Sequence, residues 1–226
     1  MIKNVLIDLD DTIFDFHKAE AIGISKTLEQ IGIEPSEKNI KRYSEINDSQ
    51  WKLLEKGVLT REQVLTRRFS LLFEELGVAC DPMETRNIYE TYLSKGHFLI
   101  DGAEDMLKEL SKNYNLYLVS NGTAKVQHGR LDSSDIQKYF KEIFISQEIG
   151  YNKPDVRFFE ECFKKIGNIK RDETIIVGDS LSSDIQGGIN AGIHTCWFNP
   201  KNQENNTLIK PEMTVRKLGE ISQVIK

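Results

Sequence analysis

The sequence predicts an α/β protein: a doubly wound parallel sheet with a helical unit inserted after its first strand. Two observations support this prediction. Short apolar segments rich in β-branched residues alternate with helical patterns, as expected for parallel strands joined by right-handed crossovers. One long interval departs from this alternation because it contains helical patterns only. We expect strands at residues 5–9, 116–120, 143–146, 174–178 and 195–198.

The interval that contains only helical patterns runs from residue 16 to residue 98. Its helix-start signals are Ser36 or Asn39, Thr60 with Gln63 three residues on, and Asp81 before Pro82. About four helices are too many for one crossover, so we expect a separate helical domain over residues 16–98, lying over the carboxyl edge of the sheet. Residues 1–15 and 99–226 would then form the α/β core.

The rest of the chain returns to the alternating pattern. Helices are expected in "GAEDMLKELSK", "VRFFEECFKKIG" and "SDIQGGINAG", between the later strands. The polar, turn-rich segment 199–214 is expected to be a surface loop.

Composition restricts the class of function. A formal net charge of −5 argues against a broad nucleic-acid or membrane surface, and no apolar run is long enough to span a bilayer. The N-terminus lacks the apolar region of a signal peptide. Cys80, Cys162 and Cys196 show neither a disulfide framework nor zinc-ligand spacing. We therefore expect a cytoplasmic protein, monomeric or weakly dimeric, that acts on a small molecule.

Two groups of aspartates follow strands of the predicted sheet. Asp8 and Asp10 follow the first strand, and Asp179 and Asp184 follow the strand at residues 174–178. In a common doubly wound order these two strands are neighbours, so the two acidic groups face each other at the edge where ligands bind. Carboxylates without histidines or thiols suit a hard cation such as Mg²⁺.

Two further fragments suit a phosphate group. "VSNG" ends the second strand with the Ser120 hydroxyl and the backbone amides of Asn121 and Gly122, which could form an anion nest. "NKPD" places Lys153 before a rigid proline at a helix start, where an ammonium group could neutralise both a carboxylate and a phosphate. By contrast, we expect Asp11 and Asp15 to have local roles, as solvated or helix-capping residues.

Together these motifs resemble the haloacid dehalogenase-like phosphohydrolase superfamily. The matching features are DxDxT after the first strand, Ser at the end of the second, Lys-Pro before a later helix and GDxxxxD after the fourth strand. They occur in the family order, with a helical cap between the first two, and the resemblance covers essentially the whole chain. It implies a Rossmann-like core with an inserted cap domain.

The resemblance also implies roles for individual residues. Asp8 would be the nucleophile that forms an aspartyl-phosphate, and Asp10 the general acid and base, with Thr12 helping to hold it. The implied Mg²⁺ ligands are the carboxylates of Asp8 and Asp179 and the backbone carbonyl of Asp10, supported by Asp184. The implied phosphate-binding groups are Ser120, the Asn121 amide and Lys153. Haloacid dehalogenases themselves need no metal and lack the Asp10 equivalent, so a phosphatase is preferred.

Substrate choice is expected to lie in the helical insertion. Residues 47–69, 120–131 and 145–159 resemble the pyrimidine 5′-nucleotidase branch of the superfamily. The candidate base contacts are Phe16 and Trp51, which could stack on a base, and Arg67 and Arg68, which could meet its polar groups. The helical spacing of the insertion's aromatic residues equally fits a bundle core.

The sequence therefore predicts a Mg²⁺-dependent phosphomonoester hydrolase, most specifically a nucleoside 5′-monophosphatase. Two alternatives share the fold: a small sugar-phosphate or phosphoglycolate phosphatase, and a mutase of the β-phosphoglucomutase type. A phosphate-sensing binding protein with a decayed site is an alternative from another class, but the motif residues are intact. A phospho-accepting receiver domain would need neither the insertion nor Asp10.

Overall fold

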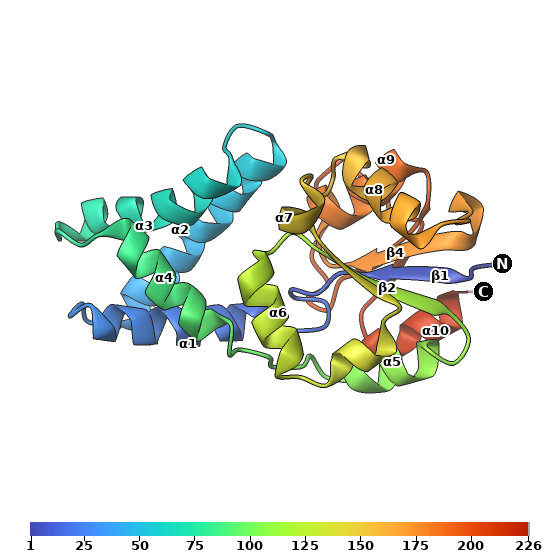
Figure 1. The fold of residues 1–226 in the computed structure, drawn as a ribbon, viewed down its shortest axis with the longest axis horizontal. Helices are drawn as coiled ribbons and strands as arrows, with labels where there is room; N and C mark the ends of the chain where they lie inside the picture. Colours follow the sequence, from blue (N-terminus) through green and yellow to red (C-terminus); the bar gives the residue numbers. More distant parts are fainter. Residues whose placement is uncertain (226) are drawn as a thin grey trace.

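Six parallel strands form one sheet in the order β3-β2-β1-β4-β5-β6 (Figure 1). This computed structural model describes residues 1–225. The strands are β1 (Asn4–Ile7), β2 (Asn115–Ser120), β3 (Glu142–Ile145), β4 (Thr174–Gly178), β5 (His194–Phe198) and β6 (Met213–Val215). The doubly wound sheet and the five expected strands are confirmed.

Strand β6 corrects the prediction of a surface loop over residues 199–214. Met213 and Thr214 pair with β5, and the strand ends at the buried residue Val215. Only this last residue is fully buried, so a three-residue edge strand has too short an apolar pattern to be recognised in the sequence.

Successive side chains of the central strands point to opposite faces of the sheet and pack into two different buried clusters. Val5 and Ile7 of β1 face a cluster that includes α5 and α10, whereas Leu6 faces the cluster formed with α8 and α9. Figure 1 shows these two helix pairs on opposite faces of the sheet. The elements outside the insertion are α5 (Ala103–Leu110), α6 (Ala124–Asp132), η1 (Ile136–Tyr139), α7 (Ser146–Ile149), α8 (Val156–Ile166), η2 (Arg171–Glu173), the π-helical turn η3 (Leu181–Ile185), α9 (Gln186–Ala191), η4 (Leu218–Glu220) and α10 (Ile221–Val224).

The insertion folds as four helices (Figure 1), and their buried side chains form a cluster to which Val126 of α6 also belongs. The helices are α1 (Phe16–Gln30), α2 (Glu37–Glu55), α3 (Arg61–Leu76) and α4 (Pro82–Leu93). At the cluster's centre the ring of Tyr43 lies 5.3 Å from the rings of both Phe69 and Tyr89. The predicted starts at Ser36, Thr60 and Asp81 are confirmed, including the capping box of Thr60 with Gln63, whereas Asn39 lies inside α2 because Ser36 already caps it.

The register of the sheet brings the ends of three strands together. Ile7 of β1 pairs with Leu118 of β2 on one side and Val177 of β4 on the other. The residues that follow these strands therefore emerge side by side at the carboxyl edge, although β1 lies more than a hundred residues before β2 and β4 in sequence. Within the described residues, no helix is both long and apolar enough to cross a bilayer.

Candidate active site

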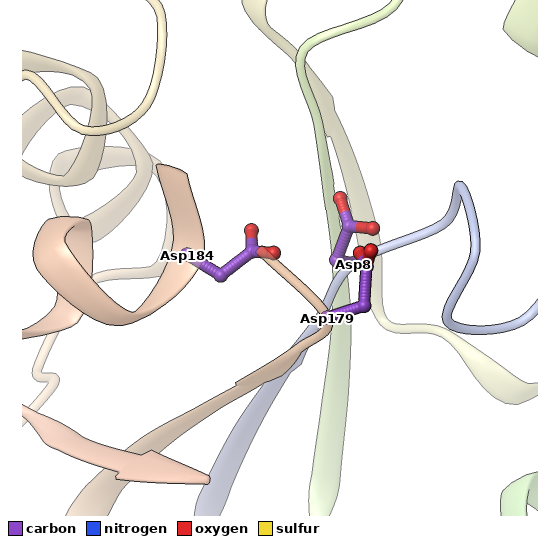
Figure 2. A group of neighbouring side chains, drawn as sticks. All are labelled: Asp8, Asp179 and Asp184. Atoms are coloured by element: carbon purple, nitrogen blue, oxygen red, sulfur yellow. The ribbon is translucent and has the colours of Figure 1, made fainter. Parts of the chain in front are cut away.

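Three carboxylates converge at the carboxyl edge of the sheet (Figure 2). Asp8 follows β1, Asp179 follows β4 and Asp184 lies in η3, and oxygen atoms of the three side chains lie within 4.8 Å of one another. Gly178 permits this approach, because a Cβ atom there would lie 2.3 Å from the Asp184 carboxylate. The expectation that the two acidic groups face each other is met by this geometry.

The ammonium group of Lys153 lies within this cluster. Its Nζ donates hydrogen bonds to Asp8 Oδ1 and Asp184 Oδ1, both at 2.6 Å, and to the Val119 carbonyl at 2.9 Å. Lys153 is 1% exposed, so these contacts replace its hydration completely. One buried ammonium cannot balance three ionised carboxylates, so full ionisation of the cluster requires a further cation.

Burial and mutual repulsion shift the protonation of the cluster. Desolvation raises the pKa of Asp8 to about 8 despite the opposing charge of Lys153, and the neighbouring carboxylates of Asp184 and Asp10 add to the rise. The pKa of Asp179 is also raised well above its ordinary value, first by burial and then by Asp8 and Asp184. Burial alone would lower the pKa of Lys153, but the two carboxylates that it contacts raise it.

Asn121 positions Lys153 through its side chain. Its Nδ2 donates to the Lys153 carbonyl at 2.8 Å, and its Oδ1 accepts the Lys153 amide at 2.8 Å. We expected the Gly122 amide to form part of an anion nest. Its backbone amide instead donates to the Ser120 hydroxyl at 3.1 Å. Ser120 ends β2 beside the cluster, and its hydroxyl proton remains available to donate.

Asp10 is held by two residues that the sequence analysis missed. Arg130 Nη1 donates to Asp10 Oδ1, and Gln127 Nε2 donates to Asp10 Oδ2 at 2.6 Å and to Ser120 Oγ at 2.8 Å. Gly122 leaves room for Gln127, because a Cβ there would lie 2.2 Å from its Nε2. Gln127 and Arg130 are three residues apart on α6, directly after β2, and this spacing of polar side chains on one helix face was the available signal.

The polar residues that follow Asp10 in sequence make contacts with different parts of the structure. We expected Thr12 to hold Asp10, but its hydroxyl instead donates to Asp179 Oδ1 at 3.4 Å. Asp11 adopts a left-handed conformation with φ 59° and accepts the Phe16 amide at 2.9 Å. Asp15 is the N-cap of α1 and accepts the Lys18 amide. These two aspartates therefore serve the first turn of α1.

A cavity of about 250 Å³ extends from the acidic cluster to the insertion. Among the four sequence candidates for base contacts, Phe16, Trp51 and Arg68 line this cavity, and Arg68 is buried. Arg67 does not line it: its side chain is exposed on the other face of α3. The wall of the insertion thus combines aromatic surface with one buried cation.

Arg61, also missed, joins the insertion to the sheet edge. Its Nη1 donates to the carbonyls of Asn121 and Gly122 at 2.7 and 2.9 Å. Its Nη2 donates to Ser146 Oγ at 2.5 Å and to Asn152 Oδ1. The guanidinium also lies 5.6 Å from the ring of Trp51. Desolvation lowers the pKa of Arg61 to about 10, and the nearby negative charge of Glu62 only partly opposes this shift.

Comparison with known proteins identifies the family. The model of the haloacid dehalogenase-like hydrolase family matches residues 5–198. The chain belongs to the haloacid dehalogenase-like hydrolases. The HAD-hydrolase YfnB of Bacillus subtilis is 38% identical over 223 residues, which cover 99% of this chain and 95% of YfnB.

Other relatives of this hydrolase carry more specific names. The pyrimidine 5′-nucleotidase PynA of Streptococcus pneumoniae is 36% identical over 214 residues, covering 94% of this chain and 90% of PynA. The pyrimidine 5′-nucleotidase YjjG of Escherichia coli is 28% identical over 221 residues, covering 98% and 96%. A crystal structure of YfnB bound to magnesium, described as revealing interdomain movement, superposes with a TM-score of 0.95 at 37% identity and covers 100% and 99% of the two chains.

The arrangement of this haloacid dehalogenase-like hydrolase leaves one reactive atom open. Lys153 occupies Oδ1 of Asp8, whereas Oδ2 has no hydrogen-bond partner among the described residues. A carboxylate held at one oxygen and open at the other can act as a nucleophile or as a metal ligand. The three carboxylates supply only oxygen atoms, the donor type that Mg²⁺ prefers, so the residues fit this ion.

Proposed function

We propose that this hydrolase is a Mg²⁺-dependent phosphomonoesterase that acts on pyrimidine nucleoside 5′-monophosphates through an aspartyl-phosphate. The observation that carries the proposal is Asp8: one of its oxygens is anchored by buried Lys153, and the other is open beside Asp179 and Asp184 at the end of the cavity. The names of PynA and YjjG, and the magnesium in the YfnB structure, support the substrate class and the ion.

In the first step, an Asp8 oxygen attacks the phosphorus and the bond from phosphorus to the nucleoside oxygen breaks. Asp10 gives its proton to that leaving oxygen. In the second step, Asp10 takes a proton from a water molecule, which attacks the phosphorus of the aspartyl-phosphate. Free phosphate leaves, and the Asp8 carboxylate is restored. The Ser120 hydroxyl and Lys153 hold the transferring oxygens.

Asp8, Asp179 and the Asp10 backbone carbonyl would hold Mg²⁺, with Asp184 in support through Lys153. Bound Mg²⁺ would neutralise the repulsion between the Asp8 carboxylate and the phosphoryl oxygens. Asp184 is buried, and it already accepts a hydrogen bond from Lys153 at Oδ1 and from the Ser180 amide at Oδ2. These contacts favour an indirect role for Asp184 over direct coordination of the ion.

We further propose that residues 1–15 and 99–226 form the catalytic domain and that residues 16–98 form a cap domain. The buried cluster formed mainly by α1–α4 and the contribution of that bundle to the cavity wall support this division. The Arg61 contacts to the turn after β2 are the kind of interaction that a closed cap makes. The interdomain movement described for YfnB supports a cap that opens to exchange substrate and product.

The test is phosphate release from a panel of UMP, dTMP, AMP and small sugar phosphates, with Mg²⁺ and with EDTA. We expect Mg²⁺-dependent release that is strongest from the pyrimidine nucleotides and absent in Asp8→Asn. Asp15→Asn is the matched control, because asparagine caps a helix as well as aspartate and should retain activity. Strongest release from sugar phosphates would refute the nucleotidase proposal, and release in EDTA would refute the metal requirement.

A further inference from the structure

Arg68 is a buried cation without a carboxylate partner. Its side chain is 2% exposed, yet among residues 1–225 no carboxylate lies within salt-bridge distance of it. Its guanidinium packs 5.1 Å from the ring of Phe69 and 5.0 Å from that of Tyr89. Its Nε donates to the Leu65 carbonyl at 3.3 Å and its Nη1 to Asn47 Oδ1 at 2.9 Å. Within the described chain, Nη2 meets no acceptor, and Arg68 lines the cavity.

Asn47 fixes both Arg68 and Trp51 on the cavity wall. Its Oδ1 accepts Arg68 Nη1 and, at 3.0 Å, the indole Nε1 of Trp51. Both partners are donors only, so the orientation of the Asn47 amide is determined by its contacts. Its Nδ2 donates at 2.8 Å to Glu20, a buried carboxylate that also accepts the Ser44 hydroxyl. A guanidinium and an indole are thus preorganised side by side.

The charges around Arg68 indicate what it would bind. Three carboxylates of the insertion also line the cavity: Asp48, Glu55 and Glu90. Among the described residues of the insertion, Arg68 is the one cation that lines it. Within residues 1–225, Glu90 alone of the three has a salt-bridge partner, Arg86 at 2.9 Å. A second anionic group on the substrate would be repelled by these carboxylates. A neutral acceptor such as a carbonyl oxygen would satisfy Arg68 without adding charge.

We propose that Arg68 donates a hydrogen bond to the 2-carbonyl oxygen of a pyrimidine base whose ring lies against Trp51. This proposal rests on the proposed nucleotidase function and assigns its base specificity. Uracil, thymine and cytosine all carry that carbonyl, whereas adenine carries no carbonyl. A donor-only group that is fixed and buried discriminates against a base that leaves it unpaired.

The experiment compares kcat/KM for UMP, AMP and p-nitrophenyl phosphate, which has no base, in wild type and in Arg68→Met. We expect kcat/KM for UMP to fall about 10- to 100-fold, as for the loss of a hydrogen bond to a charged group, with little change for AMP or p-nitrophenyl phosphate. Arg67→Met, which removes the adjacent exposed arginine, should leave all three values unchanged. Arg68→Lys keeps the charge without the planar fork, so an intermediate loss is expected.

A second measurement does not depend on hydrolysis. Calorimetric binding of uridine, which lacks the phosphate, should be detectable in wild type and lost in Arg68→Met. An unchanged UMP-to-AMP ratio in Arg68→Met, or an equal loss on p-nitrophenyl phosphate, would overturn the role of Arg68 while the nucleotidase proposal stood. A wild type that hydrolyses p-nitrophenyl phosphate but no nucleotide would overturn both proposals.

Discussion

Arg130 of α6 forms an ion pair with Asp10 from a fully buried position, and the same guanidinium donates through Nε to the Gly96 carbonyl at 2.6 Å. Asp10 is the more exposed partner, with 28% of its side chain accessible. The pair therefore fixes the carboxyl group at the cavity while the arginine stays within the structure. Arg130 touches no reacting atom in the proposed chemistry, so we describe it as a positioning residue.

Replacing Arg130 by methionine should lower kcat about 10- to 100-fold, a partial loss of the roughly 10²- to 10⁴-fold that a general acid–base group contributes. The physical reason is that Asp10 loses the contact that orients it. Adding the Arg130→Met change to an Asp10→Asn enzyme should cause little further loss, which a double-mutant cycle measures. Arg130→Lys, which keeps a charge near Asp10, should recover part of kcat. Losses that multiply in the double variant would contradict a positioning role.

Replacing Lys153 by methionine should destabilise the protein in EDTA. Asp8 and Asp184 would keep their buried carboxylates without the ammonium between them, a situation that costs about 3–5 kcal/mol. Urea denaturation should show this as a lower midpoint at unchanged slope. Adding Asp184→Asn removes one of the stranded charges and should restore part of the stability. A double variant less stable than Lys153→Met would contradict this explanation.

Stabilisation by Mg²⁺ should increase with pH. In EDTA, burial raises the pKa of Asp8 to about 8, so the folded protein keeps a proton that the unfolded chain releases near 3.8. That proton's contribution to stability is complete below the lower value and is lost as the pH rises through the higher one. The raised pKa of Asp179 acts in the same direction. A cation must displace these protons, so it binds more weakly at low pH.

Thermal unfolding with and without Mg²⁺ at about pH 6 and about pH 8.5 checks this prediction. The melting temperature in EDTA should be lower at the higher pH, and the increase caused by Mg²⁺ should be larger there. Asp179→Asn should reduce that increase at both pH values. An equal increase at both pH values in wild type would contradict the proton competition.

Replacing Arg61 by methionine should loosen the contact between the helical insertion and the turn after β2. The turn would lose two hydrogen bonds to its carbonyls, each worth about 1 kcal/mol or more, and Trp51 would lose a neighbouring cation. We expect faster amide hydrogen exchange near residues 121–123 and a KM for UMP raised about 3- to 10-fold, with the Arg67→Met variant unchanged. Exchange rates equal to wild type would show that other contacts hold the insertion.

The sequence by itself determined the insertion, the convergence of the aspartates and the sheet except for its edge strand β6. Each of these follows from short-range patterns combined with one general property of parallel sheets, that their strands end at a common edge. Asp8 and Asp179 could be placed together because each directly follows an apolar strand. Helix starts such as Thr60 were equally local, since the capping side chain and its partners lie within one turn.

Only the tertiary structure decided which side chains surround those aspartates. Arg67 and Arg68 are adjacent in sequence, but one residue along a helix turns a side chain by about 100°, so one is exposed and the other lines the cavity. The Thr12 hydroxyl donates to Asp179 rather than to Asp10, which is nearer in sequence. Arg130 reaches Asp10 across 120 positions. Such contacts depend on how α3 and α6 rotate and pack against the rest of the fold, and a pattern confined to one element does not contain that information.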